Sequence, residues 1–204
     1  MQLRYLLIKV LFLITPFFVL SQEFNGGLIG GISATEISGD RLEGPNKAGM
    51  YAGGFVNRYF TERSSAQMEL NFVQKGSRMN PDSTNGYSSY LLRINYVELF
   101  LHYKWDFHPR FTLETGPSLG VLISSYEEAD FQLLDNPFEP IDLSINIGLF
   151  YHLNERWSFN IRYSNSILPV RPHSQGQTYN LNKGQYNEVL SFTFHYLIKQ
   201  NRGL

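Results

Sequence analysis

The sequence predicts an all-β protein, an eight-stranded antiparallel up-and-down transmembrane β-barrel. Three observations predict it. Alternation of apolar and polar residues with a period of two recurs eight times after residue 23, with no long helical period between. These segments are roughly 10–16 residues long, whereas soluble strands average about 5–6 and tilted membrane-spanning strands need about 9–11. The connections between them alternate strictly between short and long.

The earlier strands follow from alternation that starts in a glycine-rich segment, FNGGLIGGISA, where Phe24, Leu28 and Ile32 share one side. The second segment, AGMYAGGFVNRYF, has the same character. In the third, SSAQMELNFVQKG, Met68 and Leu70 alternate with polar residues, and the fourth, YLLRINYVELFLHYKW, is longer and more aromatic. These four segments are 24–34, 48–60, 64–76 and 90–105.

The later strands alternate as clearly. In FTLETGPSLGVLI, small polar residues and glycine oppose large aliphatic residues, and IDLSINIGLFYH repeats this arrangement. The segments WSFNIRYSNSI and NEVLSFTFHYLIK place aromatic and aliphatic residues on one side and serine, threonine or asparagine on the other. These four segments are 111–123, 141–152, 157–167 and 187–199.

The connections predict how the barrel is oriented. The short connections are 61–64, 106–110 and 153–156, and the long ones are 35–47, 76–89, 124–140 and 168–186. In an up-and-down barrel alternate connections emerge at the same end, so the short turns share one rim. Outer-membrane barrels have short periplasmic turns and long external loops. We therefore expect both ends of the barrel chain on the periplasmic side.

The two faces of each strand predict what touches lipid. The interior of an eight-stranded barrel is just wide enough to be filled by side chains. Small polar residues suit that interior and large aliphatic residues suit lipid, so Leu70 and Phe72 should point outward and Glu69 and Asn71 inward. The alternative is a soluble lipocalin-like carrier of a small ligand, which needs the opposite assignment of faces.

Four charged residues on the inward faces predict an interior polar network: Glu69, Glu98, Glu114 and Arg162. Charges in a narrow interior are costly unless they are paired and hydrogen-bonded. We expect a carboxylate–guanidinium network that stiffens the barrel. A proton or ion pathway is an alternative use of these residues, and a paired-carboxylate hydrolase is disfavoured because substrate could hardly enter a filled interior.

Aromatic residues flank the three short turns. Interfacial aromatic girdles border the lipid-facing band of membrane barrels. We expect such a girdle at the periplasmic rim, formed by Tyr59, Trp105, Phe111, Tyr151 and Trp157. Ordinary core aromatic residues beside turns are the alternative interpretation.

The long connection 124–140 is acidic and apolar, and it contains no lysine or arginine. Its candidate partner-binding residues are Glu127, Glu128, Asp130, Phe131, Asp135 and Phe138. A partner-docking loop and a weak calcium site are both compatible with this composition, although its spacing does not match an EF-hand. A solvated loop that packs on its neighbours is the plainer interpretation.

Composition excludes several classes of function. The net charge of −1 over 204 residues gives no nucleic-acid footprint, and the absence of cysteine excludes disulfides and a lipid-modified cysteine. No zinc-like histidine spacing or phosphate-binding loop occurs, so we assign no catalytic, cofactor-binding or metal-binding residues. Residues 1–21 have the pattern of a secretory signal peptide, which leaves 22–204 as the barrel domain.

Five stretches together resemble the PorT-like family of small outer-membrane β-barrel proteins: GGLIGG, ELNFVQKG, YVELFLHYKW, ETGPSLG and RYSNSI. The resemblance spans residues 24–199. It implies an outer-membrane protein. We expect a non-enzymatic protein in the outer membrane of a Gram-negative bacterium, with a structural or interaction role, in contact with lipid and a protein partner in the membrane or periplasm. A role accessory to protein secretion to the cell surface is implied by the family's namesake. The enzymatic alternative is a lipid-modifying barrel that uses His173 and Ser174.

Overall fold

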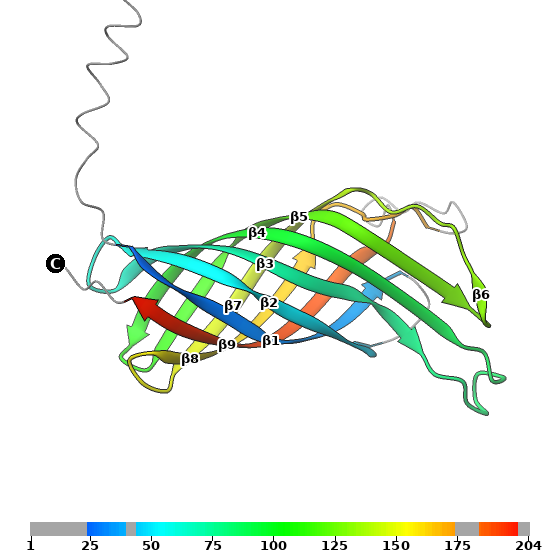
Figure 1. Cartoon of the computed structure of the whole chain (residues 1–204), viewed down its shortest axis with the longest axis horizontal. Helices are drawn as coiled ribbons and strands as arrows, with labels where there is room; N and C mark the ends of the chain where they lie inside the picture. Colours follow the sequence, from blue (N-terminus) through cyan, green and yellow to red (C-terminus); the bar gives the residue numbers. More distant parts are fainter. Residues whose placement is uncertain (1–23, 40–43, 174–183, 200–204) are drawn as a thin grey trace, which may run out of the picture.

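The computed structural model describes residues 24–39, 44–173 and 184–199, and it forms a β-barrel (Figure 1). Because polar and apolar residues alternate, each strand can present one face to lipid and the other to the interior. The strands of the wall are β1 (Asn25–Ser38), β2 (Lys47–Tyr59), β3 (Ser64–Met79), β4 (Tyr90–His108), β5 (Phe111–Ala129), β7 (Ile141–His152), β8 (Trp157–Ser166) and β9 (Tyr186–Lys199).

The wall closes on itself. Neighbouring strands follow the order β4-β3-β2-β1-β9-β8-β7-β5, all antiparallel, and β4 pairs with β5 to complete the ring. A two-residue strand, β6 (Gln132–Leu133), pairs only with the end of β5. The prediction of a closed eight-stranded antiparallel barrel is confirmed. The predicted signal peptide, residues 1–21, lies outside the described residues.

The long-loop end differs from the prediction. Residues 124–129 were expected to be loop, but they continue β5, which like β4 is 19 residues long. Cross-strand pairing explains the extension, because Tyr90 to Ile94 of β4 pair with Ser125 to Ala129 of β5. In Figure 1 the ends of β3, β4 and β5 reach beyond the rest of the wall at this end.

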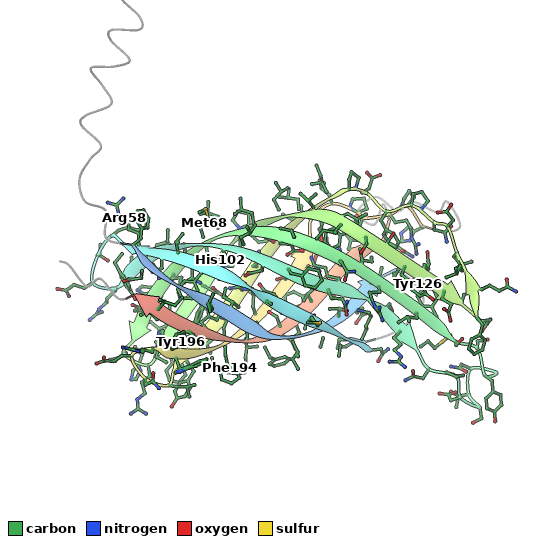
Figure 2. All side chains as sticks on the ribbon, viewed as in Figure 1. Arg58, Met68, His102, Tyr126, Phe194 and Tyr196 are labelled. Atoms are coloured by element: carbon green, nitrogen blue, oxygen red, sulfur yellow. The ribbon has the colours of Figure 1, made fainter. Side chains whose placement is uncertain are left out.

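The orientation of the faces is as predicted. Leu70 is 59% exposed on the outside, whereas the neighbouring Glu69 is 1% exposed in the interior. Figure 2 shows Met68 and Phe194 on the outer surface of the barrel. A soluble carrier needs its apolar side chains to line an internal pocket, so this arrangement contradicts that alternative.

The interior combines polar side chains with two small apolar clusters. One cluster, Ile29, Tyr51, Val73 and Phe100, lies within the barrel. The other closes the interior toward the long-loop end and comprises Ile37, Leu92, Ile94, Tyr96, Phe138 and Val170. Within the described ranges, no helix is long and apolar enough to cross a membrane.

Candidate functional site

Arg162 connects opposite sides of the interior. From β8 it forms a two-bond pair with Glu69 of β3, with Nη2 2.7 Å from Oε1 and Nη1 2.9 Å from Oε2. It also donates to Glu114 of β5, from Nε to Oε1 at 2.7 Å and from Nη2 to Oε2 at 3.2 Å. All three residues are at most 1% exposed. Two-bond arginine–carboxylate pairs are strong and fix orientation, so this centre holds the walls together.

Neutral side chains add hydrogen bonds to both carboxylates and to Arg162. Gln67 donates to Glu69 Oε1 at 2.6 Å, and Asn71 donates to Oε2 at 2.8 Å. Asn160 donates to Glu114 Oε1 at 2.9 Å, and the Tyr51 hydroxyl accepts from Arg162 at 2.8 Å. These bonds offset the cost of burying charge in the interior.

Glycine makes room for one of these carboxylates. Gly148 of β7 lies beside Glu114 in the register, and a Cβ added there would collide with Glu114 Oε1. Any larger residue at this position would displace the carboxylate from Arg162.

His102 completes a group of possible metal donors in the centre. Its Nδ1 lies 3.4 Å from Glu114 Oε2 and 3.7 Å from Glu69 Oε1. Donor atoms of Glu69, His102 and Glu114 all lie within 4.8 Å of one another. However, Arg162 already occupies both carboxylates, so the arrangement fits an ion pair better than a metal centre.

Glu98 does not join Arg162. Its ion-pair partner among the described residues is Lys75, at 2.5 Å, and Lys75 also lies 2.9 Å from Asp142. The predicted single network is therefore two ionic clusters, one around Arg162 and one around Lys75. Sequence reasoning missed Lys75, although Lys75 lies inside the predicted strand 64–76 and shares the inward parity of Glu69.

A cavity of about 800 Å³ opens at the short-turn rim. Its deep wall includes Gln67, Lys104, Phe150 and His195, and its mouth lies among the three short turns. Lys104, which lies on the same face of β4 as Glu98, is 7% exposed. No pattern in the sequence indicates the cavity, because its width depends on how side chains from all the strands fill the interior.

The predicted aromatic girdle residues occupy two kinds of position. Trp105 and Trp157 are 46% and 44% exposed on the outer surface. The rings of Phe111 and Tyr151 contact each other at a tilt, with centroids 5.3 Å apart. Tyr59 instead lines the mouth of the cavity. The structure thus places four of the five residues on the outer side of the short-turn rim, and the membrane interface there stays a prediction.

The acidic connection divides into buried and exposed residues. Glu127 accepts hydrogen bonds from Arg171 at 2.7 Å, Tyr90 at 2.6 Å and Asn136 at 3.2 Å. Burial raises the pKa of Glu127, but the bonds from Arg171 and Tyr90 outweigh it and hold the pKa below its ordinary value. Phe138 is 8% exposed and lies beneath the Arg171 guanidinium, 4.4 Å from it.

Glu127 and Phe138 are therefore packed within this end of the barrel. Asp130, Phe131 and Asp135 are exposed, and Glu128 accepts a hydrogen bond from Tyr126. His173 of the enzymatic alternative is described, whereas Ser174 lies outside the described residues.

Comparisons with known proteins agree with this architecture. A family model described as an outer membrane protein beta-barrel domain matches residues 20–170. No protein of curated function matches the chain in sequence.

Solved structures share the fold at low sequence identity. The attachment invasion locus protein Ail of Yersinia pestis has a TM-score of 0.52 and 11% identity, over 86% of this chain and 99% of its own. Ail in complex with the heparin analogue sucrose octasulfate gives the same TM-score at 10% identity, over 86% of this chain and 99% of its own. Neisserial surface protein A also scores 0.52 with 11% identity, over 85% of this chain and 96% of its own. These likenesses support the fold.

Proposed function

Because this chain belongs to the family of outer membrane proteins with this beta-barrel domain, we propose that it is a non-enzymatic interaction protein that docks a protein partner at its long-loop end. The protein lies in the outer membrane of a Gram-negative bacterium. Long loops of such barrels face the cell exterior, so the proposed docking surface is external.

The observation that carries this proposal is an exposed apolar tip at the ends of β4 and β5. Phe131 is 84% exposed, Tyr87 is 73% exposed and Leu133 is 72% exposed. Large exposed apolar side chains that lie together often mark an interaction surface, whereas single scattered ones do not. We call these three residues the apolar tip.

Backbone conformation supports a role for the apolar tip. Tyr87, Asp130 and Phe131 have φ values of 63°, 47° and 63°, in the left-handed region that non-glycine residues seldom adopt. Two hydrogen bonds hold the turns together, from Asp130 N to Ser89 O at 2.9 Å and from Ser89 N to Asp130 Oδ1 at 2.8 Å. Such strain persists where the surrounding structure fixes it, often at binding sites.

Charge narrows the chemistry of the partner. The two connections that carry the apolar tip also hold exposed carboxylates, at Asp82, Asp130, Asp135 and Glu139. They favour a partner surface that combines apolar and basic groups, and they disfavour polyanions such as the sucrose octasulfate bound by Ail. The resemblance to PorT-like proteins supports a partner in the machinery that secretes proteins to the cell surface.

Crosslinking tests the proposal directly. Cells would carry the wild-type chain, the tip variant Phe131→Ser/Leu133→Ser, or a control variant, Phe60→Ser, which removes a 56%-exposed aromatic side chain at the opposite rim. After mild crosslinking and purification from outer membranes, we expect a partner to be captured by wild type and Phe60→Ser and lost from the tip variant. Equal capture by all three would contradict a docking role for the apolar tip.

Two assays separate the finer functions. If the protein assists secretion, cells that carry the tip variant should release less protein to their surface than cells with wild type. If it were a lipid-modifying enzyme, His173→Ala would change the lipid composition of the outer membrane. We expect no such change.

A further inference from the structure

We propose that the cavity at the short-turn rim binds a small organic carboxylate with an aromatic body. Its volume of about 800 Å³ lies within the range of about 300–1,000 Å³ that is usual for small-molecule sites. It opens among the short turns and so faces the periplasm. This inference does not depend on a protein partner at the apolar tip, which lies at the other end of the barrel.

The sign of the ligand's charge follows from Lys104. Its ammonium donates to Gln67 Oε1 at 2.9 Å and lies 3.7 Å from the centre of the Phe150 ring. Among the described residues no carboxylate lies within 4.0 Å of it, whereas Lys75, the buried lysine further along the interior, pairs with both Glu98 and Asp142. An ammonium has three donors, so Lys104 retains capacity to bind an anion.

Two more polar atoms in the cavity wall point to a ligand. Asn57 Oδ1 and His195 Nδ1 are buried and have no hydrogen-bond partner within the part of the chain that the structure describes. Buried polar atoms are nearly always paired, so these two mark where a ligand's polar groups would fit. Asn57 Oδ1 is an acceptor, which suits a hydroxyl or amide N–H on the ligand.

The apolar part of the wall is aromatic. The Phe150 ring meets His195 edge-on with centroids 4.8 Å apart, and the Phe55 ring lies 5.4 Å from His195. These rings form a surface against which a planar ligand can stack. At the mouth, the cavity is also lined by Arg63, Arg110 and Arg156, with Glu62, Asp106 and Glu155 among them. Positive and negative charges at the mouth nearly balance. The buried ammonium of Lys104 therefore determines which charge the ligand should carry.

The interior end of the cavity is closed. Gln67, which accepts from Lys104, donates to Glu69 at 2.6 Å, and Glu69 is held by Arg162. The Arg162 cluster thus separates the cavity from the rest of the interior. The ligand binds and leaves on the periplasmic side.

Fluorine NMR can test this with matched probes. The protein would be reconstituted in phosphatidylcholine nanodiscs and titrated with 3-fluoro-4-hydroxyphenylacetate, with empty nanodiscs as the baseline. The amine 3-fluorotyramine has the same aromatic body and hydroxyl but carries a cation in place of the carboxylate. We expect the carboxylate to bind in preference to the amine. Equal or tighter binding of the amine would overturn the proposal without any variant.

Substitutions locate the site. Lys104→Met should weaken binding of the carboxylate probe about tenfold or more, because a charge-assisted hydrogen bond is lost. Lys104→Arg keeps the cation and should bind more tightly than Lys104→Met. The control is Lys47→Met, a buried lysine outside the cavity, which should bind as wild type does. Each variant's fold is verified by its heat-dependent mobility on gels, and wild-type affinity in a folded Lys104→Met would overturn the assignment.

Discussion

Arg162 determines the charge balance of the interior at the scale of single residues. It bonds two buried carboxylates from separate strands, and neutral donors also bond to each of them. Removing one partner from a buried pair leaves an uncompensated charge, which costs more than the intact pair contributes. The same reasoning explains why Glu98 has its own cation in Lys75.

Replacing Arg162 by methionine should lower the free energy of unfolding by about 3–5 kcal/mol, because Glu69 and Glu114 would lose their shared cation. Urea unfolding in phospholipid vesicles measures this. The control is Arg58→Met, because Arg58 is exposed and forms no ion pair in the described structure. A triple variant that adds Glu69→Gln and Glu114→Gln should recover much of the loss, and a cost no greater than that of Arg58→Met would contradict the network's role.

The pair of Glu127 with Arg171 should make stability depend on pH at the long-loop end. The folded-state pKa of Glu127 is held below its ordinary value, so its contribution is present above the unfolded pKa of about 4.3 and is lost as pH falls through the folded pKa. Glu127→Gln should therefore reduce stability relative to wild type at pH 7, with the difference shrinking toward pH 3.

Urea unfolding at the two pH values measures this difference. Asp135→Asn removes an exposed carboxylate of the same connection and serves as the control, for which we expect little difference at either pH. If Glu127→Gln were as much less stable than wild type at pH 3 as at pH 7, the geometry of the hydrogen bonds would matter and the charge would not.

At the scale of elements, alternate residues of each strand face two different environments, the outside of the barrel and its interior. Leu99 of β4 is 44% exposed on the outside, and its neighbours Glu98 and Phe100 are almost fully buried. Leu99 also pairs with Leu70 and Leu119, outward residues of the flanking strands. Alternation that continues across three neighbouring strands makes a continuous apolar band for lipid.

Leu99→Arg should therefore destabilise the barrel by about 2–4 kcal/mol, the cost of an arginine near the middle of the bilayer. Urea unfolding in vesicles again gives the value. Leu133→Arg is the matched control, since Leu133 is 72% exposed beyond the wall at the long-loop end and should tolerate the charge. Equal costs for the two variants would place Leu99 outside the hydrocarbon.

The whole molecule is a closed cylinder whose interior is occupied by side chains. The Arg162 cluster and the Lys75 cluster lie at successive levels, and an apolar cluster that includes Ile94 and Val170 closes the long-loop end. Eight strands leave an interior that side chains fill. The cavity at the short-turn rim is therefore a blind pocket.

In planar bilayers the wild-type protein should show no steady ion conductance, because Arg162 and its two carboxylates occupy the middle of the interior. Eight strands do not form a barrel wide enough for an open channel, since the diameter of a barrel grows with its number of strands. The matched comparison is Arg162→Ala/Glu69→Ala, which removes the central guanidinium and one of its two carboxylates and should conduct more if it folds. Steady wild-type conductance would contradict the filled interior.

The sequence by itself determined the strand positions, the antiparallel wall, the outward apolar faces and the inward placement of Glu69, Glu114 and Arg162. Alternation with a period of two can be recognised within a single strand, so the sequence of each strand indicates which of its faces is apolar. Only the tertiary structure decided that Glu98 pairs with Lys75, that β5 extends to Ala129, that Glu127 and Phe138 are buried, and that a cavity remains at the rim. These outcomes depend on the register between strands and on which side chains meet across the interior, and neither is written in the pattern of any one strand.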